Sequence, residues 1–263
     1  MTSAEGPGAR YTYGDSELAA ERLGLIAETF EPATRSFLER VRPVRSPVRL
    51  ALDLGCGPGH TTRLLHEVLG PARTVGLDAS GPYVMRARRA AGAGIDFAVH
   101  DATAVPFPIG PPDVVYARLL LAHLPSPAGV VARWANALAK RGVLLLDDLE
   151  AIETQEPACR AYLDEVALPV VRAQGGELLV GPTLHAMDDP RGTVRDLDDV
   201  ATFTPPAAVS ARIFAMNLAV LVERHEIAPR PDLAEALGDA AGARRTALPT
   251  TWHVRQLAFR RNG

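Results

Sequence analysis

The sequence predicts an α/β fold, in which one open, mostly parallel β-sheet carries helices on both faces. Between Leu50 and Glu150, short apolar runs alternate with stretches of helical periodicity, which is the pattern of consecutive strand–helix units. A glycine-rich turn follows the first apolar run and leads directly into a helical stretch. The length of 263 residues suits one such domain with a cap, because a second independent core would be cramped.

The elements of this fold can be followed along the chain. Asp15–Val41 is predicted to be a helix, because apolar residues recur in it at about 3.6-residue spacing and Asp15 or Ser16 can cap its start. Crossovers of the expected length make the following strands parallel. In chain order, the predicted strands and helices of the core are Val48–Leu54, Thr61–Leu69, Arg73–Leu77, Pro82–Ala91, Ile95–His100, Val114–Tyr116, Ala128–Ala139 and Val143–Leu146.

The part of the chain after the core is less regular. Thr154–Ala173 is a predicted helix that is interrupted or ended near Pro169, because proline cannot donate a helical hydrogen bond. Ala207–His225 is a second predicted helix, and Thr251–Arg260 is a predicted closing strand. Gly181–Pro206 is rich in Asp, Pro and Thr and has weak periodicity, so it is interpreted as a loop.

These elements predict a three-part organisation of one domain. The N-terminal and C-terminal parts are expected to cover the carboxyl ends of the strands, where ligands of open α/β sheets bind. The parts are an N-terminal helical cap or lid (residues 1–45), a ligand-binding core (residues 46–150), and a C-terminal part with a cap insertion and closing strands (residues 151–263).

Composition restricts the classes of function. A net charge of −3 disfavours nucleic acid or an anionic membrane as partner, since both need a basic surface. No apolar run approaches the roughly 18 residues that span a bilayer, and the polar start has no signal-peptide core. Cys56 and Cys159 fit a reducing compartment, and the histidines show no metal-binding spacing. We expect a cytoplasmic protein without a metal, and leave open its oligomeric state, a homodimer included.

The motif that predicts chemistry is the turn Leu54-Gly55-Cys56-Gly57 at the end of the first core strand. Glycines permit backbone angles that a Cβ forbids and let a ligand approach the main chain beside a helix start. Asp78 ends the next strand, about 20 residues further on, where an acid can accept hydrogen bonds from both ribose hydroxyls. The sequence therefore predicts a nucleoside-containing ligand.

Three ligands compete for such a turn. A dinucleotide site requires a small residue where His60 stands, and a phosphate-binding loop requires a Gly-Lys-Ser/Thr ending that the chain lacks. The Asp53 carboxylate, just before the first glycine, would repel a pyrophosphate. It would suit a ligand with a cationic amino group and a sulfonium, which indicates S-adenosylmethionine.

Five segments in order resemble the motifs of class I S-adenosylmethionine-dependent methyltransferases. The resemblance covers about Val48 to Glu150, and several ordered motifs are far more specific than one glycine pair. It implies a Rossmann-like, seven-stranded sheet and S-adenosyl-L-homocysteine as product. The five segments are LDLGCGPGHTT (Leu52–Thr62), VGLDAS (Val75–Ser80), HDATAVPFP (His100–Pro108), DVVYARLLLAHLPSP (Asp113–Pro127) and RGVLLLDDLE (Arg141–Glu150).

Carried over position by position, the resemblance also implies the residues of the cofactor site. Gly55, Cys56 and Gly57 would line the methionine part of the cofactor. Asp53 would orient its amino group through water or the loop backbone, and Asp78 would hold the ribose. The complete implied set is Asp53, Gly55, Cys56, Gly57, His60, Thr61, Asp78, Ala79, Tyr83, Asp101, Ala102 and Arg118.

The adenine end of the cofactor has its own implied partners. Ala79 and Tyr83 would pack against adenine, while Asp101 would accept from its amino group and Ala102 would offer a backbone N–H. For Asp101 a purely turn-forming role is the alternative. Arg118 departs from the small polar residue common at its position, and it would face the cofactor or an acidic substrate.

His123 is the candidate catalytic residue. One interpretation is a histidine that packs beneath the loop before Pro125; the other is a general base that titrates near pH ~6.5. A carboxylate acceptor would need no base, and Arg118 or Arg255 would then bind it. Much of the catalysis can come from positioning, because a sulfonium is already a good leaving group.

The predicted function is methyl transfer to a small molecule, with natural-product biosynthesis as the expected setting. The flanks, YTYGDSELAAERL and WHVRQLAFRR, resemble actinobacterial methyltransferases of the small-molecule type. Two other interpretations stay open. One is a protein or peptide methyltransferase, and the other is a cofactor-binding protein that has lost methyl transfer or catalyses another rearrangement.

Overall fold

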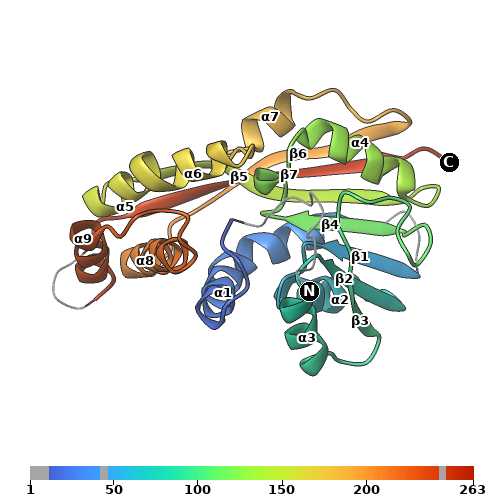
Figure 1. Ribbon diagram of the computed structural model, residues 1–263. Helices are drawn as coiled ribbons and strands as arrows, with labels where there is room; N and C mark the ends of the chain where they lie inside the picture. Colours follow the sequence, from blue (N-terminus) through green and yellow to red (C-terminus); the bar gives the residue numbers. More distant parts are fainter. Residues whose placement is uncertain (1–11, 42–46, 243–246) are drawn as a thin grey trace.

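Seven strands form one sheet in the spatial order β3-β2-β1-β4-β5-β7-β6 (Figure 1). The computed structural model describes residues 12–41, 47–242 and 247–263. The first five strands in this order are parallel, and β7 runs antiparallel to both β5 and β6. The strand bounds are β1 Leu50–Leu54, β2 Arg73–Asp78, β3 Ile95–Val99, β4 Val114–Arg118, β5 Val143–Thr154, β6 Thr193–Phe203 and β7 Thr250–Arg261.

Helices cover both faces of the sheet and gather around one end of it. β5 and β7 extend beyond β4, and α5, α6, α8 and α9 lie around this extension (Figure 1). None of the helices in the described ranges is long and apolar enough to cross a membrane. The helix bounds are α1 Glu17–Arg40, α2 His60–Leu69, α3 Gly81–Arg89, η1 Leu121–His123, α4 Pro127–Ala137, α5 Pro157–Tyr162, η2 Leu163–Ala167, α6 Leu168–Ala173, α7 Gly181–Ala186, α8 Ala207–Glu223 and α9 Pro231–Ala241.

The predicted α/β fold with a mostly parallel, seven-stranded sheet is confirmed. The core strands and helices begin and end within two residues of their predicted positions, except that β5 continues to Thr154. The predicted helix at Thr154–Ala173 therefore starts later, and it does not end near Pro169. Pro169 stands at the start of α6, directly after the π-helical turn η2, whose wider i→i+5 bonding accommodates a residue without an N–H.

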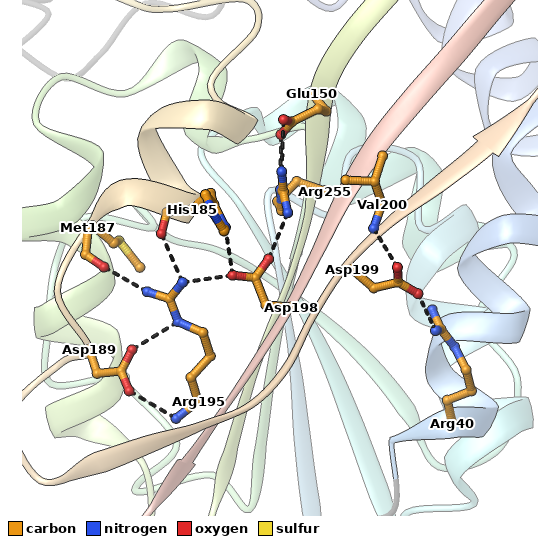
Figure 2. A network of polar contacts seen from close by, with 10 residues as sticks. All are labelled: Arg40, Glu150, His185, Met187, Asp189, Arg195, Asp198, Asp199, Val200 and Arg255. Carbon is orange, nitrogen blue, oxygen red and sulfur yellow. Dashed lines mark hydrogen bonds and ion pairs between the residues drawn. The ribbon is translucent and has the colours of Figure 1, made fainter.

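The predicted loop Gly181–Pro206 is wrong, because it contains both α7 and the edge strand β6. β6 has no buried residue, so the alternation of apolar and polar side chains that reveals a half-buried strand is missing. Its backbone pairs with β7, and its side chains form ion pairs (Figure 2): Arg195 bonds to Asp189 and Asp198. Helix α9 was likewise not predicted.

Candidate active site

A cavity of about 770 Å³ lies at the carboxyl ends of the parallel strands. This volume is within the range of roughly 300–1,000 Å³ typical of small-molecule sites. One end is lined by the glycine turn after β1 and by residues that follow β2 and β3. The other end is lined by side chains of α1, α5, η2 and α8, together with residues of β5 and β7. The cavity therefore joins the parallel core to the helices at the extended end of the sheet.

The backbone of the glycine turn lines one end of the cavity. Gly55 and Gly57 have φ of +66° and +51°, which favours glycine at both positions. The N–H groups of Gly55 and Cys56 donate to Leu77 O at 2.8 and 3.1 Å, so the turn is tied to β2. A Cβ on Gly55 would stand 2.9 Å from a methyl group of Leu120. Both glycines line the cavity; the absence of a Cβ on Gly55 makes room for Leu120, and a Cβ on Gly57 would stand 3.4 Å from a methyl group of Leu23.

Asp78 ends β2 and lines the cavity beside this turn. Its Oδ2 accepts from Gly57 N and its Oδ1 from Ser80 N, each at 2.8 Å. Burial raises the pKa of Asp78 above its ordinary value, while these two backbone bonds act in the opposite direction. Each carboxylate oxygen has a second lone pair. Asp78 can thus accept two further hydrogen bonds from a pair of hydroxyls.

Eleven of the thirteen predicted site residues line the cavity. Among them, the Cys56 thiol has a pKa well above its usual range because of burial, so it is not a nucleophile. Asp101 Oδ1 accepts from both Thr103 N and Thr103 Oγ1 at 2.8 Å, which is the turn-forming arrangement. The eleven residues are Gly55, Cys56, Gly57, His60, Thr61, Asp78, Ala79, Asp101, Ala102, Arg118 and His123.

Two predicted residues do not line the cavity. Asp53 is buried behind the turn, and its Oδ2 accepts from the Thr61 and Thr62 hydroxyls at 2.6 and 2.7 Å. Burial raises the pKa of Asp53 to about 6. Tyr83 is also buried, and its hydroxyl donates to Gly14 O at 2.8 Å. The carboxylate therefore anchors the start of α2, and the tyrosine anchors the segment before α1.

The two arginines considered for a carboxylate acceptor are both engaged in other contacts. Arg255 lies outside the cavity, where it bonds to both oxygens of Glu150 at 2.8 and 2.9 Å and to Asp198 at 2.8 Å (Figure 2). Arg118 does line the cavity, but its charge acts to lower the pKa of the buried Asp147 and Asp53 carboxyls. Arg255 is therefore excluded as an acceptor ligand.

His123 stands on the 3₁₀ turn η1 and lines the cavity, with its ring edge-on to the Tyr13 ring at 6.1 Å. Its Nδ1 lies 3.2 Å from the Thr12 hydroxyl, which donates its single proton to Gln174 Oε1 at 2.6 Å. Nδ1 must then carry the imidazole proton, which places the basic lone pair on Nε2. Burial, and to a smaller degree the Arg22 charge, lower the pKa of His123 to about 4. These surroundings hold the pKa of His123 well below the ordinary value near ~6.5 from which the prediction started.

Sequence reasoning missed the residues at the far end of the cavity. We call this end the acceptor lobe and define it by Tyr13, Arg22, Phe30, Tyr162, Phe214, Asn217 and Trp252. Trp252 of β7 is only 4% exposed, although it lines the cavity. The residues of the lobe come from the N-terminal segment, α1, α5, α8 and β7. In the sequence, each of these segments has the pattern of an ordinary apolar helix or strand face.

The segment before α1 is bound to α3 at the other side of the cavity. Besides the Tyr83–Gly14 bond, the Ser80 hydroxyl donates to Asp15 Oδ2 at 2.7 Å, and Arg86 forms an ion pair with Glu17. Tyr11 and the rest of residues 1–11 and 42–45 lie outside the described residues. The closing lid therefore stays a prediction.

Comparison with known proteins agrees with this geometry. Residues 51–142 match the model of a methyltransferase domain family. The nocamycin O-methyltransferase of Saccharothrix syringae is 32% identical over 216 residues, which cover 80% of this chain and 73% of that protein. The chain belongs to the class I S-adenosylmethionine-dependent methyltransferases.

Two further comparisons describe the range of relatives. The trans-aconitate 2-methyltransferase of Methylobacterium radiotolerans is 36% identical over 62% of this chain, and the match spans 55% of that protein. The chain thus spans about half the length of such curated relatives. The solved phosphoethanolamine N-methyltransferase 2 of Haemonchus contortus, in complex with S-adenosylhomocysteine, superposes with a TM-score of 0.54 at 15% identity. The superposition covers 92% of this chain and 58% of that protein, and it shows that the two share a fold.

The methyltransferase also has a buried acid that supports η1. Asp148 Oδ2 accepts from Leu121 N at 3.3 Å, and the backbone N–H groups of Leu120 and Ala122 lie near enough to favour the charged carboxylate. Burial and the neighbouring Asp147 charge raise the pKa of Asp148 to about 8, while the backbone N–H groups of η1 act to lower it. Asp148 thereby fixes the backbone from which His123 projects.

Replacing Asp148 with asparagine is expected to change how stability depends on pH. An unfolded aspartate titrates near ~3.9, so between pH ~4 and ~8 the folded state holds an extra proton, and its stability falls as the pH rises. Asparagine does not titrate. The unfolding free energy of Asp148→Asn minus that of the wild type should therefore rise with pH, by up to about 1.4 kcal/mol per pH unit between pH 5 and 8. Urea denaturation measures this; a difference independent of pH would contradict it.

Proposed function

We propose that this methyltransferase transfers a methyl group from S-adenosylmethionine to a small organic acceptor. The observation that carries the proposal is a single cavity with two unlike ends. One end combines a glycine turn with the half-buried Asp78 carboxylate, and the other is the acceptor lobe. His123 lines the same cavity, with its ring 6.1 Å from the Tyr13 ring of the acceptor lobe. Such an arrangement suits two ligands that meet near the middle of the cavity.

The residues at the glycine end fit the cofactor. Asp78 would accept from the ribose hydroxyls with its two remaining lone pairs, because its other two are used by Gly57 N and Ser80 N. The backbone of Gly55 and Gly57, which carry no side chain, would lie against the methionine portion. Ala79, Asp101 and Ala102 would surround the adenine. When bound, S-adenosylmethionine supplies an electrophilic methyl group on a sulfonium.

The chain contributes positioning and a proton acceptor to the reaction. The acceptor lobe would hold the acceptor in line with the methyl group and exclude water, which accounts for much of the rate in reactions of this type. His123 Nε2 would take the proton from the acceptor oxygen or nitrogen as the bond to the methyl group forms. Because its Nδ1–H is directed to Thr12, the ring presents Nε2 as its basic atom.

The setting we propose is natural-product biosynthesis in the cytoplasm. Support for the first comes from the relationship to the nocamycin O-methyltransferase, which covers most of both chains. Support for the second comes from Cys56 and Cys159, which are both free and buried, as expected in a reducing compartment.

Ligand binding and product formation test the proposal together. Calorimetric titration of the protein should show binding of S-adenosylhomocysteine and none of NAD. Incubation with S-adenosylmethionine and a panel of hydroxylated and aminated small molecules should then produce S-adenosylhomocysteine with at least one acceptor. Tight binding of NAD would contradict the cofactor assignment. Binding of S-adenosylhomocysteine without turnover of any acceptor would favour a cofactor-binding protein that has lost methyl transfer.

A further inference from the structure

The acceptor lobe has a continuous aromatic wall. The Tyr162 and Phe214 rings are stacked with centroids 5.1 Å apart, and the Phe214 and Trp252 centroids are 5.4 Å apart. Phe30 meets Trp252 edge-on at 5.3 Å. The indole N–H of Trp252 already donates to Ser210 Oγ at 3.0 Å, so this wall presents apolar ring surface. Flat apolar molecules pack well against such surfaces.

A hydrogen-bond acceptor, the amide oxygen of Asn217, interrupts this apolar surface. Asn217, on α8, lines the cavity and is 8% exposed, and its Oδ1 has no hydrogen-bond partner within the described residues. Its amide lies near the Tyr162 hydroxyl, whose pKa it acts to lower. Buried polar atoms in folded proteins are nearly always paired, and leaving one unpaired is unfavourable. Asn217 Oδ1 is therefore placed to accept a hydrogen bond from a donor group of a ligand.

The charges around the cavity argue against a small polycarboxylate in the lobe. Of the described arginines that line the cavity, Arg118 acts on the buried carboxyls of Asp53 and Asp147, and Arg224 pairs with Glu226 at 3.4 Å. Arg22 lies over the Tyr13 ring, 4.3 Å from its centroid. Three carboxylates of one ligand would thus have to share Arg22 inside an aromatic pocket, and burying unpaired charges is costly.

We propose that the acceptor is a bulky, mainly apolar aromatic compound whose hydroxyl or N–H group donates to Asn217 Oδ1. The aromatic wall holds the ring system, and the amide oxygen sets its orientation relative to His123. This inference rests on the proposed function and adds the class of acceptor. It distinguishes the chain from enzymes that take a small tricarboxylate such as trans-aconitate.

Two probes that differ in one donor test the inference. With S-adenosylhomocysteine at saturation, calorimetry should show 2-naphthol binding about tenfold more tightly than 2-methoxynaphthalene, which has the same rings and no donor. In Asn217→Leu this preference should fall to near one, with affinity for S-adenosylhomocysteine unchanged. In Asn136→Leu, which alters an exposed asparagine on α4, the preference should remain. trans-Aconitate should bind the wild type more weakly than 2-naphthol.

The outcomes of these binding measurements distinguish failure of the inferred acceptor class from failure of the proposed function. If the wild type binds S-adenosylhomocysteine but binds both naphthalenes equally, or neither, the inferred acceptor class is wrong. Tighter binding of trans-aconitate than of 2-naphthol would overturn it as well. If S-adenosylhomocysteine itself does not bind, the proposed function fails. The comparison of probes uses the wild type, so it stands even where Asn217→Leu does not fold.

Discussion

Asp78→Ala is expected to weaken binding of S-adenosylhomocysteine by about 100-fold. The proposed site loses two hydrogen bonds from ribose hydroxyls to a half-buried carboxylate, and bonds to charged groups are worth about 1.5–3 kcal/mol each. The substitution also frees Gly57 N and Ser80 N, which the carboxylate now holds at 2.8 Å, so the glycine turn becomes less ordered. Calorimetric titration of the two proteins with S-adenosylhomocysteine measures the change.

Asp96→Ala is the matched control for this experiment. Asp96 is a carboxylate on the adjacent strand β3, but its side chain is 57% exposed and pairs with Arg73 on the surface. Its removal should leave the affinity unchanged. An Asp78→Ala protein that keeps wild-type affinity and the wild-type circular dichroism spectrum would show that the carboxylate does not hold the ribose.

His123→Ala is expected to lower turnover by about 100-fold while affinity for S-adenosylhomocysteine stays unchanged. A general base typically contributes about 10²–10⁴-fold, and the pKa of about 4 makes this imidazole a weak base, so the low end applies. The same pKa keeps His123 neutral from pH 6 to 9. Turnover should therefore be independent of its ionisation in that range and fall only as the pH approaches 4. Release of S-adenosylhomocysteine from the best hydroxylated aromatic acceptor, followed across this range, provides the measurement.

His185→Ala serves as the control for the base. His185 is 58% exposed and pairs with Asp198 beside β6, outside the cavity (Figure 2). Its removal should not alter turnover. A loss below about fivefold in His123→Ala would reject the base and leave positioning as the source of the rate. A rise in wild-type rate centred near pH 6.5 that disappears in His123→Ala would show that the histidine is more exposed to water than its surroundings indicate.

The strand–helix alternation and the glycine turn were predictable because they depend on local physics. Gly55 and Gly57 are needed where the chain turns with positive φ, and Asp78 follows from the place where β2 ends. The sheet order of the parallel part then brings these ends to one edge. The same local logic failed for β6, an edge strand that lacks a burial pattern and whose Asp199 and Asp198 pair with Arg40 and Arg255 from distant segments.

The sequence by itself determined the α/β core, the glycine turn and the carboxylate that faces it, because backbone sterics and hydrophobic periodicity operate over a few residues. Only the tertiary structure decided that Asp53 and Tyr83 act as buried anchors and that His123 is held neutral. It also decided the acceptor lobe, where Asn217 of α8 and Trp252 of β7 line one cavity. Burial, desolvation and partners far apart in the chain set these properties, and no local pattern encodes them.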